Sequence, residues 1–300
     1  MSHHHHHISK SHSSKILFTI FLNIGITVAQ IIGGLLSGSL ALLSDALHNF
    51  TDVISLIISY IASIFSSKDA SEKRTFGYKR AEILAAFVNA ATLVVIAVIL
   101  IKEAIDRFFN PQTIESDLVI ILSFVAILGN GFSVLLLKSQ SQRNMNMKSA
   151  YLHLLTDMLA SIAVLIGGLL MKFYEIFWID SLLTLAIALY LIYVSVDLLF
   201  KSYRVLMLFT PDHVNINKIV NKVNTINGVY LLHHVHVWQL NDDEIHLEAH
   251  LEFKENFKIS EFDDILMKIE NLLKSDFGIN HVTIQPEYNK PDSKDIIVQD

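Results

Sequence analysis

The stretch LALLSDALHNFTDVISLIISYIASIF (40–65) decides the fold class. About 20 mostly apolar residues are enough to cross a bilayer as a helix, yet this run contains His48 and Asp52, four residues apart. The same spacing returns at His153 and Asp157 in a second apolar stretch. Ionisable side chains at membrane depth are costly unless they are partnered, so two matched pairs indicate a functional site inside a membrane protein.

The composition indicates one membrane part and one water-soluble part. The chain has 300 residues, of which 52% are hydrophobic and 17% charged. Apolar residues dominate 16–66 and 80–209, whereas charged and apolar residues alternate from 211 onward. The absence of cysteine excludes disulfides and thiolate metal sites, which leaves His, Asp and Glu as strong metal ligands. A net charge of -6 without a large basic patch gives no sign of nucleic-acid binding.

Six stretches are long and apolar enough to be membrane spans. They lie at 16–36, 40–65, 80–107, 115–137, 149–171 and 178–203. Basic residues gather in 67–80, in 138–148 and near the chain ends, while the opposite loops carry only Lys102, Arg107 and Lys172. The positive-inside rule therefore predicts a multi-pass protein of the lipid bilayer with both termini in the cytoplasm.

The C-terminal part has the pattern of a small α+β domain. We expect a helix at 212–223, strands at 229–239 and 244–253, a helix at 259–274 and a strand at 281–287. This α-β-β-α-β order predicts a ferredoxin-like domain. The predicted fold class is thus a membrane all-α six-helix transmembrane bundle plus a cytosolic α+β domain.

Four segments follow from these boundaries. They are a His-rich cytosolic arm (1–15), a six-span transmembrane domain (16–209), a cytosolic ferredoxin-like metal-binding and dimerisation domain (210–288) and a disordered polar tail (289–300). The arm contains His3 to His7 and His12, which suit either a weak zinc-collecting segment or the remnant of a purification tag.

The paired motif suits a zinc ion. On an α-helix, residues four apart lie one turn above each other on one face, so each His/Asp pair can converge on one ion. If spans 2 and 5 pack together, two imidazoles and two carboxylates form a four-ligand cage. Zinc prefers four ligands, imidazole selects against magnesium and calcium, and two carboxylates neutralise a dication. Interhelical hydrogen bonding is the better explanation for the single polar residues Asn23, Gln30, Asn89 and Asn130.

Several segments resemble one known family. They are SGSLALLSDALHNFTD (37–52), RTFGYKRAEILAAFVN (74–89), SAYLHLLTDMLAS (149–161), HHVHVWQL (233–240) and HVTIQPEY (281–288). Together they resemble the cation diffusion facilitator family, in particular its zinc-transporting branch, in which both motifs are His-x-x-x-Asp.

The resemblance implies a function and a site. It implies a homodimer of six-span protomers that exchanges cytosolic Zn²⁺, and possible further ions such as Cd²⁺, for H⁺ by alternating access. In a bacterium it implies efflux across the inner membrane, and in a eukaryote the same orientation would fill an organelle. Carried over residue by residue, the transport site is His48, Asp52, His153 and Asp157.

The resemblance also implies zinc in the cytosolic domain. The matching positions are His233, His250, His281 and Glu287. Strand alternation by itself leaves several ligand sets open, because it places His234 and His236 on one face and His233 on the other. It places a further set on one face of the next strand: His246, Glu248 and His250. A solvated sheet face with scattered histidines is the alternative.

Four other positions carry expectations. Asp45, three residues before His48, is expected to orient an imidazole. The loop after span 2 has no His and has Tyr78 where some relatives have a ligand, so a second metal site is not expected there. Arg80 and Asp212 lie near positions that form a charge interlock in some relatives.

Other classes of function fit the sequence less well. A membrane-anchored zinc sensor has no need of four buried ligands. An intramembrane metallohydrolase needs an open coordination position and a general base such as the Glu of His-Glu-x-x-His, which the sequence lacks. A channel requires weak binding and rapid release, which a four-ligand cage opposes. A secondary transporter that is not an enzyme is therefore the predicted class.

Overall fold

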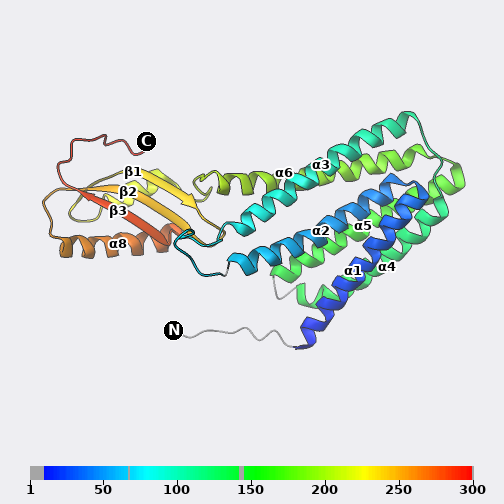
Figure 1. Cartoon of the computed structure of the whole chain (residues 1–300), viewed down its shortest axis with the longest axis horizontal. Coiled ribbons are helices and arrows are strands. Elements are labelled where there is room, and N and C mark those ends of the chain that lie inside the picture. The colour runs from blue at the N-terminus through cyan, green and yellow to red at the C-terminus, as the bar shows by residue number, and fades with distance from the viewer. Residues whose placement is uncertain (1–9, 67, 142–144, 299–300) are drawn as a thin grey trace. The chain divides into compact units, whose positions relative to one another are not determined.

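Six long helices form the N-terminal two thirds of the chain. The computed structural model describes residues 10–66, 68–141 and 145–298. The helices are α1 (Lys10–Ser37), α2 (Leu40–Ser66), α3 (Ala81–Phe109), α4 (Ser116–Ser141), α5 (Met145–Tyr174) and α6 (Trp178–Leu206) (Figure 1). Each coincides with one predicted span, and α1 begins before the predicted boundary at 16. The first nine residues of the His-rich arm lie outside the described residues.

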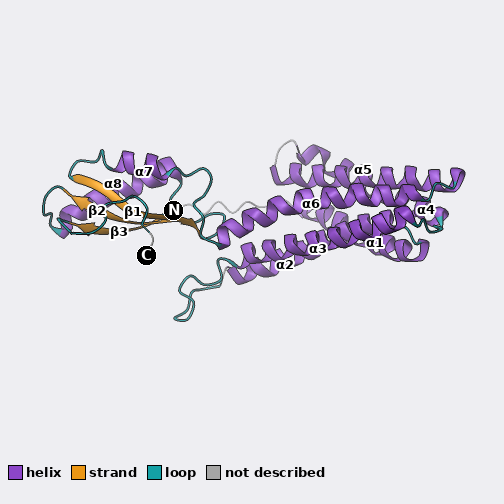
Figure 2. Cartoon of the chain, turned by 90° about the horizontal axis from the view of Figure 1, so that it is seen from above, coloured by secondary structure: helices purple, strands orange, loops and turns teal. Residues whose placement is uncertain are grey.

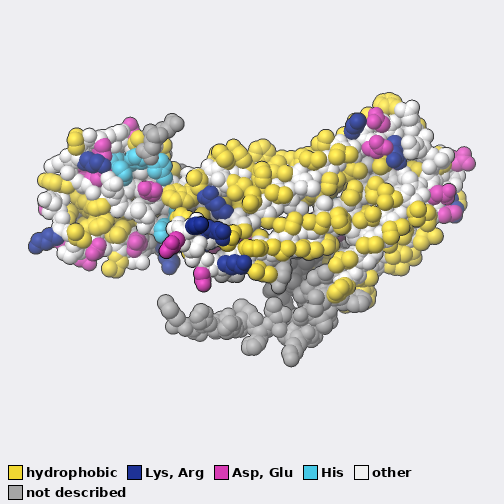
Figure 3. Space-filling view, viewed as in Figure 1, with side chains coloured by type: hydrophobic (Ala, Val, Ile, Leu, Met, Phe, Trp, Pro, Cys, Tyr) yellow, Lys and Arg dark blue, Asp and Glu magenta, His cyan; other side chains and the backbone are white. Residues whose placement is uncertain are grey.

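The helical part has the outer surface of a membrane protein. Among the described residues, four helices are long and apolar enough to cross a bilayer, and α1 contributes a shorter apolar stretch, Phe21–Ser37. Hydrophobic side chains cover most of the face of these helices seen in Figure 3. Large side chains of these helices, such as Phe21, Leu135 and Tyr193, are exposed, which in water would be unfavourable and in lipid is favourable. The predicted multi-pass membrane protein is confirmed.

The C-terminal domain has the predicted element order. It consists of α7 (Ile216–Val223), β1 (Val229–Gln239), β2 (Ile245–Phe253), α8 (Ile259–Phe277) and β3 (His281–Glu287). The sheet order is β1-β2-β3, with β2 antiparallel to β1 and parallel to β3. Figure 2 shows α7 and α8 on one face of this sheet. Their buried residues, among them Ile219, Ile269 and Leu273, pack on the apolar face of the strands.

The other face of the sheet carries polar side chains, and the pairing of β1 with β2 is irregular there. His233 pairs with His250 and His236 pairs with Glu248, so two residues of β1 stand opposite one residue of β2. The extra residue is His234, whose φ of 48° is left-handed. This β-bulge breaks the period of two. The prediction that His233 and His236 point to opposite faces is therefore wrong, because both pair with residues of the helix-free face.

The tail after β3 also differs from the sequence-based expectation. The sequence predicts a disordered tail, and in the structure residues between 290 and 296 contact the sheet. The backbone N–H groups of His234 and Val235 donate to the carbonyls of Asp295 and Ile296, at 3.0 and 2.8 Å. The polar composition that suggested disorder consists here of side chains that find ionic partners on the sheet.

Two compact units make up the chain. One, the bundle unit, contains the chain up to Ile58 and Val88–Asp197. The other, the sheet unit, contains Ser59–Phe87 and the chain from Leu198. The division therefore falls within α2, α3 and α6, whereas the sequence suggested a single boundary at 210.

Candidate metal centres

The bundle unit brings both His-x-x-x-Asp pairs together. We call His48, Asp52, His153 and Asp157 the bundle centre. Asp52 Oδ2 lies 3.6 Å from His48 Nε2 and 3.2 Å from His153 Nε2. The Asp157 carboxylate lies 3.8 Å from His48 Nε2 and 3.5 Å from His153 Nε2. Each carboxylate thus faces both imidazoles, so α2 and α5 contribute to a single cluster.

The spacing of these atoms suits a tetrahedral ion. Zinc binds imidazole nitrogen and carboxylate oxygen at about 2.0–2.2 Å, so its ligand atoms stand about 3.3 Å apart around a tetrahedron. The four nitrogen–oxygen distances of 3.2–3.8 Å, which for Asp157 involve both carboxylate oxygens, lie near that value. Asp52 Oδ2 and Asp157 Oδ1 are buried without a hydrogen-bond donor. Buried polar atoms are normally paired, so these oxygens point to a cationic ligand between them.

The four side chains of the bundle centre differ in exposure. Asp157 is 3% exposed, whereas the His153 side chain is 45% exposed. The two ligands from α2 lie between these values, with His48 17% and Asp52 29% exposed.

A carboxylate from α6 fixes the start of α2. Asp180 accepts hydrogen bonds from the backbone N–H of Leu40 (2.8 Å) and of Ala41, and from the Ser39 hydroxyl (2.5 Å). The first N–H groups of a helix have no partner within it, and an acidic group there also offsets the helix dipole. Arg107 of α3 donates to the Gly38 carbonyl at 2.6 Å. These bonds set the position from which α2 carries His48 and Asp52 into the bundle.

Replacing this cap should lower stability. In Asp180→Ala, three buried donors lose their acceptor, so we expect a loss of about 2 kcal/mol. The fraction of protein that stays monodisperse in detergent after stepwise heating measures it. Asp117→Ala is the matched control, since Asp117 pairs with Lys172 at an exposed position and such pairs contribute about 0–1 kcal/mol. Equal heat resistance of both variants would contradict the role of Asp180.

Asp45 does not have the expected role. Its Oδ2 accepts from Gln30 Nε2 (2.7 Å) and from Ser161 Oγ (3.3 Å). No described hydrogen bond joins it to an imidazole. Asp45 instead joins α1, α2 and α5 through hydrogen bonds beside the bundle centre. Gln30 forms an interhelical hydrogen bond, as predicted.

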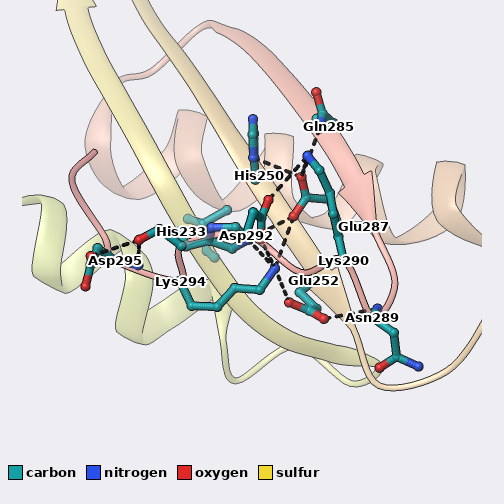
Figure 4. A network of polar contacts seen from close by, with 12 residues as sticks. His233, His250, Glu252, Gln285, Glu287, Asn289, Lys290, Asp292, Lys294 and Asp295 are labelled. Carbon is teal, nitrogen blue, oxygen red and sulfur yellow. Dashed lines mark hydrogen bonds and ion pairs between the residues drawn. The ribbon is translucent and has the colours of Figure 1, made fainter. Parts of the chain in front are cut away.

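The sheet unit contains a second candidate site. We call His233, His250 and Glu287 the sheet centre, because one ligand atom from each lies within 4.8 Å of the other two. Glu287 Oε2 lies 3.1 Å from His233 Nε2, and Glu287 Oε1 lies 2.9 Å from His250 Nδ1 (Figure 4). Two imidazoles and a carboxylate are ligands that zinc accepts, and three of them leave one coordination position for water or another donor.

Charge in the sheet centre also suits a cation. Burial lowers the pKa of His250, although Glu287 opposes this, so the imidazole favours its neutral, metal-binding form. Burial alone would raise the pKa of Glu287, but hydrogen bonds from Lys290 and Lys294 bring it below its ordinary value. The site thus holds an ionised carboxylate beside the neutral imidazole of His250.

His281, the fourth expected ligand, lies elsewhere on the sheet. It pairs with His246 of β2, whereas His250 pairs with Gln285 of β3. The rings of His281 and His246 are 4.3 Å apart, and Trp238 stacks on His246. His281 and Gln285 are four positions apart along β3, so His281 lies outside the sheet centre.

The loop before α3 makes its own contacts within the sheet unit. Tyr78 packs edge-on against Phe65, and Lys79 forms an ion pair of 2.5 Å with Glu244. Asp212 pairs with Arg204 at 2.5 Å. Among the described residues, the ion pairs found near Arg80 and Asp212 are thus Lys79–Glu244 and Arg204–Asp212.

Two residues at the sheet centre were missed in the sequence. Lys290 and Lys294 contact Glu287, but in the sequence they belong to a segment that is recognisable only as a polar tail. Lys and Asp alternate at 290, 292, 294 and 295. This pattern is a weak indication that positively and negatively charged side chains pair in this segment.

Apolar helices enclosing a dication-sized cage of imidazoles and carboxylates define the class as a membrane protein that moves metal ions. Residues 16–207 match the family model of the cation efflux transmembrane domain, and residues 211–289 match that of the cation efflux protein, cytoplasmic domain. The chain therefore belongs to the cation efflux family, the cation diffusion facilitators, and is a transporter and not an enzyme. The family resemblance noted in the sequence is confirmed.

Curated relatives are similar over nearly their whole length. A "Cadmium, cobalt and zinc/H(+)-K(+) antiporter" of Bacillus subtilis is 34% identical over 94% of this chain and 91% of its own. "Zinc transporter ZitB" of Pectobacterium atrosepticum is 32% identical over 97% and 91%. "Metal cation efflux system protein CzcD" of Cupriavidus metallidurans is 33% identical over 87% and 82%.

Proposed function

We propose that this protein exports Zn²⁺ from the cytoplasm in exchange for protons, and that the bundle centre is its transport site. The observation that carries the proposal is the set of four nitrogen–oxygen distances between two imidazoles and two carboxylates. The named substrates of the relatives support zinc, with cadmium and cobalt as further cargo.

The ligands themselves couple metal to protons. An imidazole binds either a proton or a metal at a given nitrogen, and its ordinary pKa of about 6.5 makes the two compete near neutral pH. Zinc arriving at His48 and His153 releases any protons held there. Protons that reach the same nitrogens from the opposite side displace the ion, so the loaded and protonated states alternate.

Proteoliposomes test this exchange. With equal K⁺ on both sides, an acidic lumen is expected to accelerate zinc uptake several-fold over uptake without a pH gradient. A protonophore should remove the acceleration. The name of the Bacillus relative includes K⁺, so a parallel set with a K⁺ gradient separates the two counter-ions. Uptake that is insensitive to the pH gradient would refute proton exchange.

Orientation and assembly complete the proposal. The distribution of Lys and Arg supports six spans with both termini in the cytoplasm, and in a bacterium the inner membrane as location. The match of 211–289 to the cytoplasmic domain supports the same side for the sheet unit. The family resemblance supports a homodimer.

We propose zinc at the sheet centre as well. Its two imidazoles and one ionised carboxylate support a bound ion with a structural or regulatory role. Zinc binding to the full-length protein that depends on His250 is the test of this second site.

A further inference from the structure

The segment after β3 is anchored on the helix-free face of the sheet at both ends. Near its start, the N–H of Asn289 donates to Glu252 at 3.1 Å. Near its end, the carbonyls of Asp295 and Ile296 accept from the bulge residues His234 and Val235. A bulge leaves backbone groups without a ladder partner, and buried N–H groups need an acceptor. The irregularity of β1 thus provides the docking point for the tail.

Between these anchors, two lysines reach the ligand atoms of the sheet centre (Figure 4). Lys294 Nζ lies 3.3 Å from Glu287 Oε2 and 3.4 Å from His233 Nε2. Lys290 Nζ lies 2.5 Å from Glu287 Oε1. Glu287 itself is only 1% exposed. Both oxygens of a buried carboxylate are therefore taken by ammonium groups.

A zinc ion needs the atoms that these lysines occupy. Zinc would have to lie about 2.0–2.2 Å from the oxygen and nitrogen donors, where it would repel an ammonium group at hydrogen-bond distance. Two ammonium groups carry the same total charge as one Zn²⁺. At Glu287 the ion can therefore supply the positive charge that the two lysines provide, whereas losing them without replacement would leave Glu287 buried without a cationic partner.

Lys294 has other partners to hold its charge. It lies 2.5 Å from Glu252 Oε2 and 2.5 Å from Asp292 Oδ1. Asp292 belongs to the tail, so this partner can leave the sheet together with the lysine. Lys294 can therefore leave the sheet centre and stay paired with Asp292.

We propose that Lys290 and Lys294 act as an internal cation that fills the sheet centre until Zn²⁺ displaces them, so that metal binding frees the C-terminal tail from the sheet. This inference rests on the sheet centre being a zinc site, as proposed. Because zinc must displace the two lysines, the site fills at a higher zinc concentration than its ligands alone would require. Zinc binding then releases residues 289–298 from the sheet.

Zinc affinity of the full-length protein in detergent tests the competition. The background carries Asp157→Ala to disable the bundle centre, with the leader histidines replaced by serine. In this background, Lys290→Gln with Lys294→Gln is expected to tighten zinc binding at least about tenfold, measured against a chromophoric chelator. The matched control, Lys268→Gln with Lys274→Gln on α8, removes the same charge from the opposite face and should change the affinity less than about twofold.

Tail release has its own measurement. The chain has no cysteine, so Ser293→Cys places a single spin label between the two lysines. Zinc is expected to convert its electron paramagnetic resonance spectrum from immobilised to mobile, and Mg²⁺, which prefers oxygen ligands, should not. In a His250→Ala protein, zinc should leave the spectrum immobilised.

The outcomes separate the two proposals. Unchanged zinc affinity in the double lysine variant, or an immobilised label at saturating zinc, would overturn the exchange while the zinc site stood. If His250→Ala removed no zinc from the protein, the sheet centre itself would be refuted, and the exchange with it. Neither result bears on transport through the bundle centre.

Discussion

Asp157→Asn is expected to reduce zinc uptake by about a hundredfold, because it removes one of the two carboxylates that face both imidazoles. Changes beyond the direct ligands of a zinc site already cost about 10–100-fold, and loss of a ligand also leaves the dication under-neutralised within the membrane. The measurement is initial zinc flux into proteoliposomes at a fixed pH gradient, normalised to inserted protein.

The control for this variant is its neighbour on α5. Thr156 donates its hydroxyl to the Leu152 carbonyl, so Thr156→Val changes the same helix turn without touching the bundle centre. Asp157→Asn should keep its heat resistance or gain some, since two carboxylates close together destabilise the metal-free fold. Wild-type flux in Asp157→Asn would remove this residue from the transport site.

His48→Asp is expected to lower the ratio of zinc to manganese uptake by about tenfold or more. Three carboxylates and one imidazole make an oxygen-rich site, and oxygen donors favour Mn²⁺ and other harder ions. Aspartate is also shorter than histidine, which leaves space for water and for the higher coordination number that manganese accepts. Competition of Mn²⁺ and Cd²⁺ against zinc in the same vesicle assay gives the ratio.

His48→Asn separates ligand exchange from simple damage. It removes the imidazole without adding charge, so zinc flux should fall while manganese flux does not rise. A His48→Asp protein that transports both metals in the wild-type ratio would show that His48 does not contact the ion.

Regular features of the molecule were predictable from sequence. Runs of apolar residues long enough to span a bilayer located α1 to α6, and alternation located the strands within about a residue. The four-residue spacing of His48 and Asp52 predicted that they share a helix face, and the cost of buried charge predicted that α5 would supply partners. These inferences depend on the periodicity of apolar and polar residues within one helix or strand, and that periodicity is the same in the folded protein.

The irregular features were not predictable. One extra residue in β1 moves His236 to the face of His233, and nothing in HHVHV indicates which residue bulges. The tail lies on the sheet because Lys290 and Lys294 meet Glu287 and Glu252, which are close only after β2 and β3 pair. His281 was transferred by resemblance, and the strand register, not the motif, decides that its neighbour is His246.

The bonds from Asp180 to the first residues of α2 have a mechanical consequence. A carboxylate that grips backbone N–H groups transmits displacement between two helices, whereas sliding apolar surfaces do not. At this end, hydrogen bonds therefore join α2 to α6, and Arg107 joins α3 to the turn beside them. A displacement of α6 at this end is expected to move the start of α2, and with it the helix that bears His48 and Asp52.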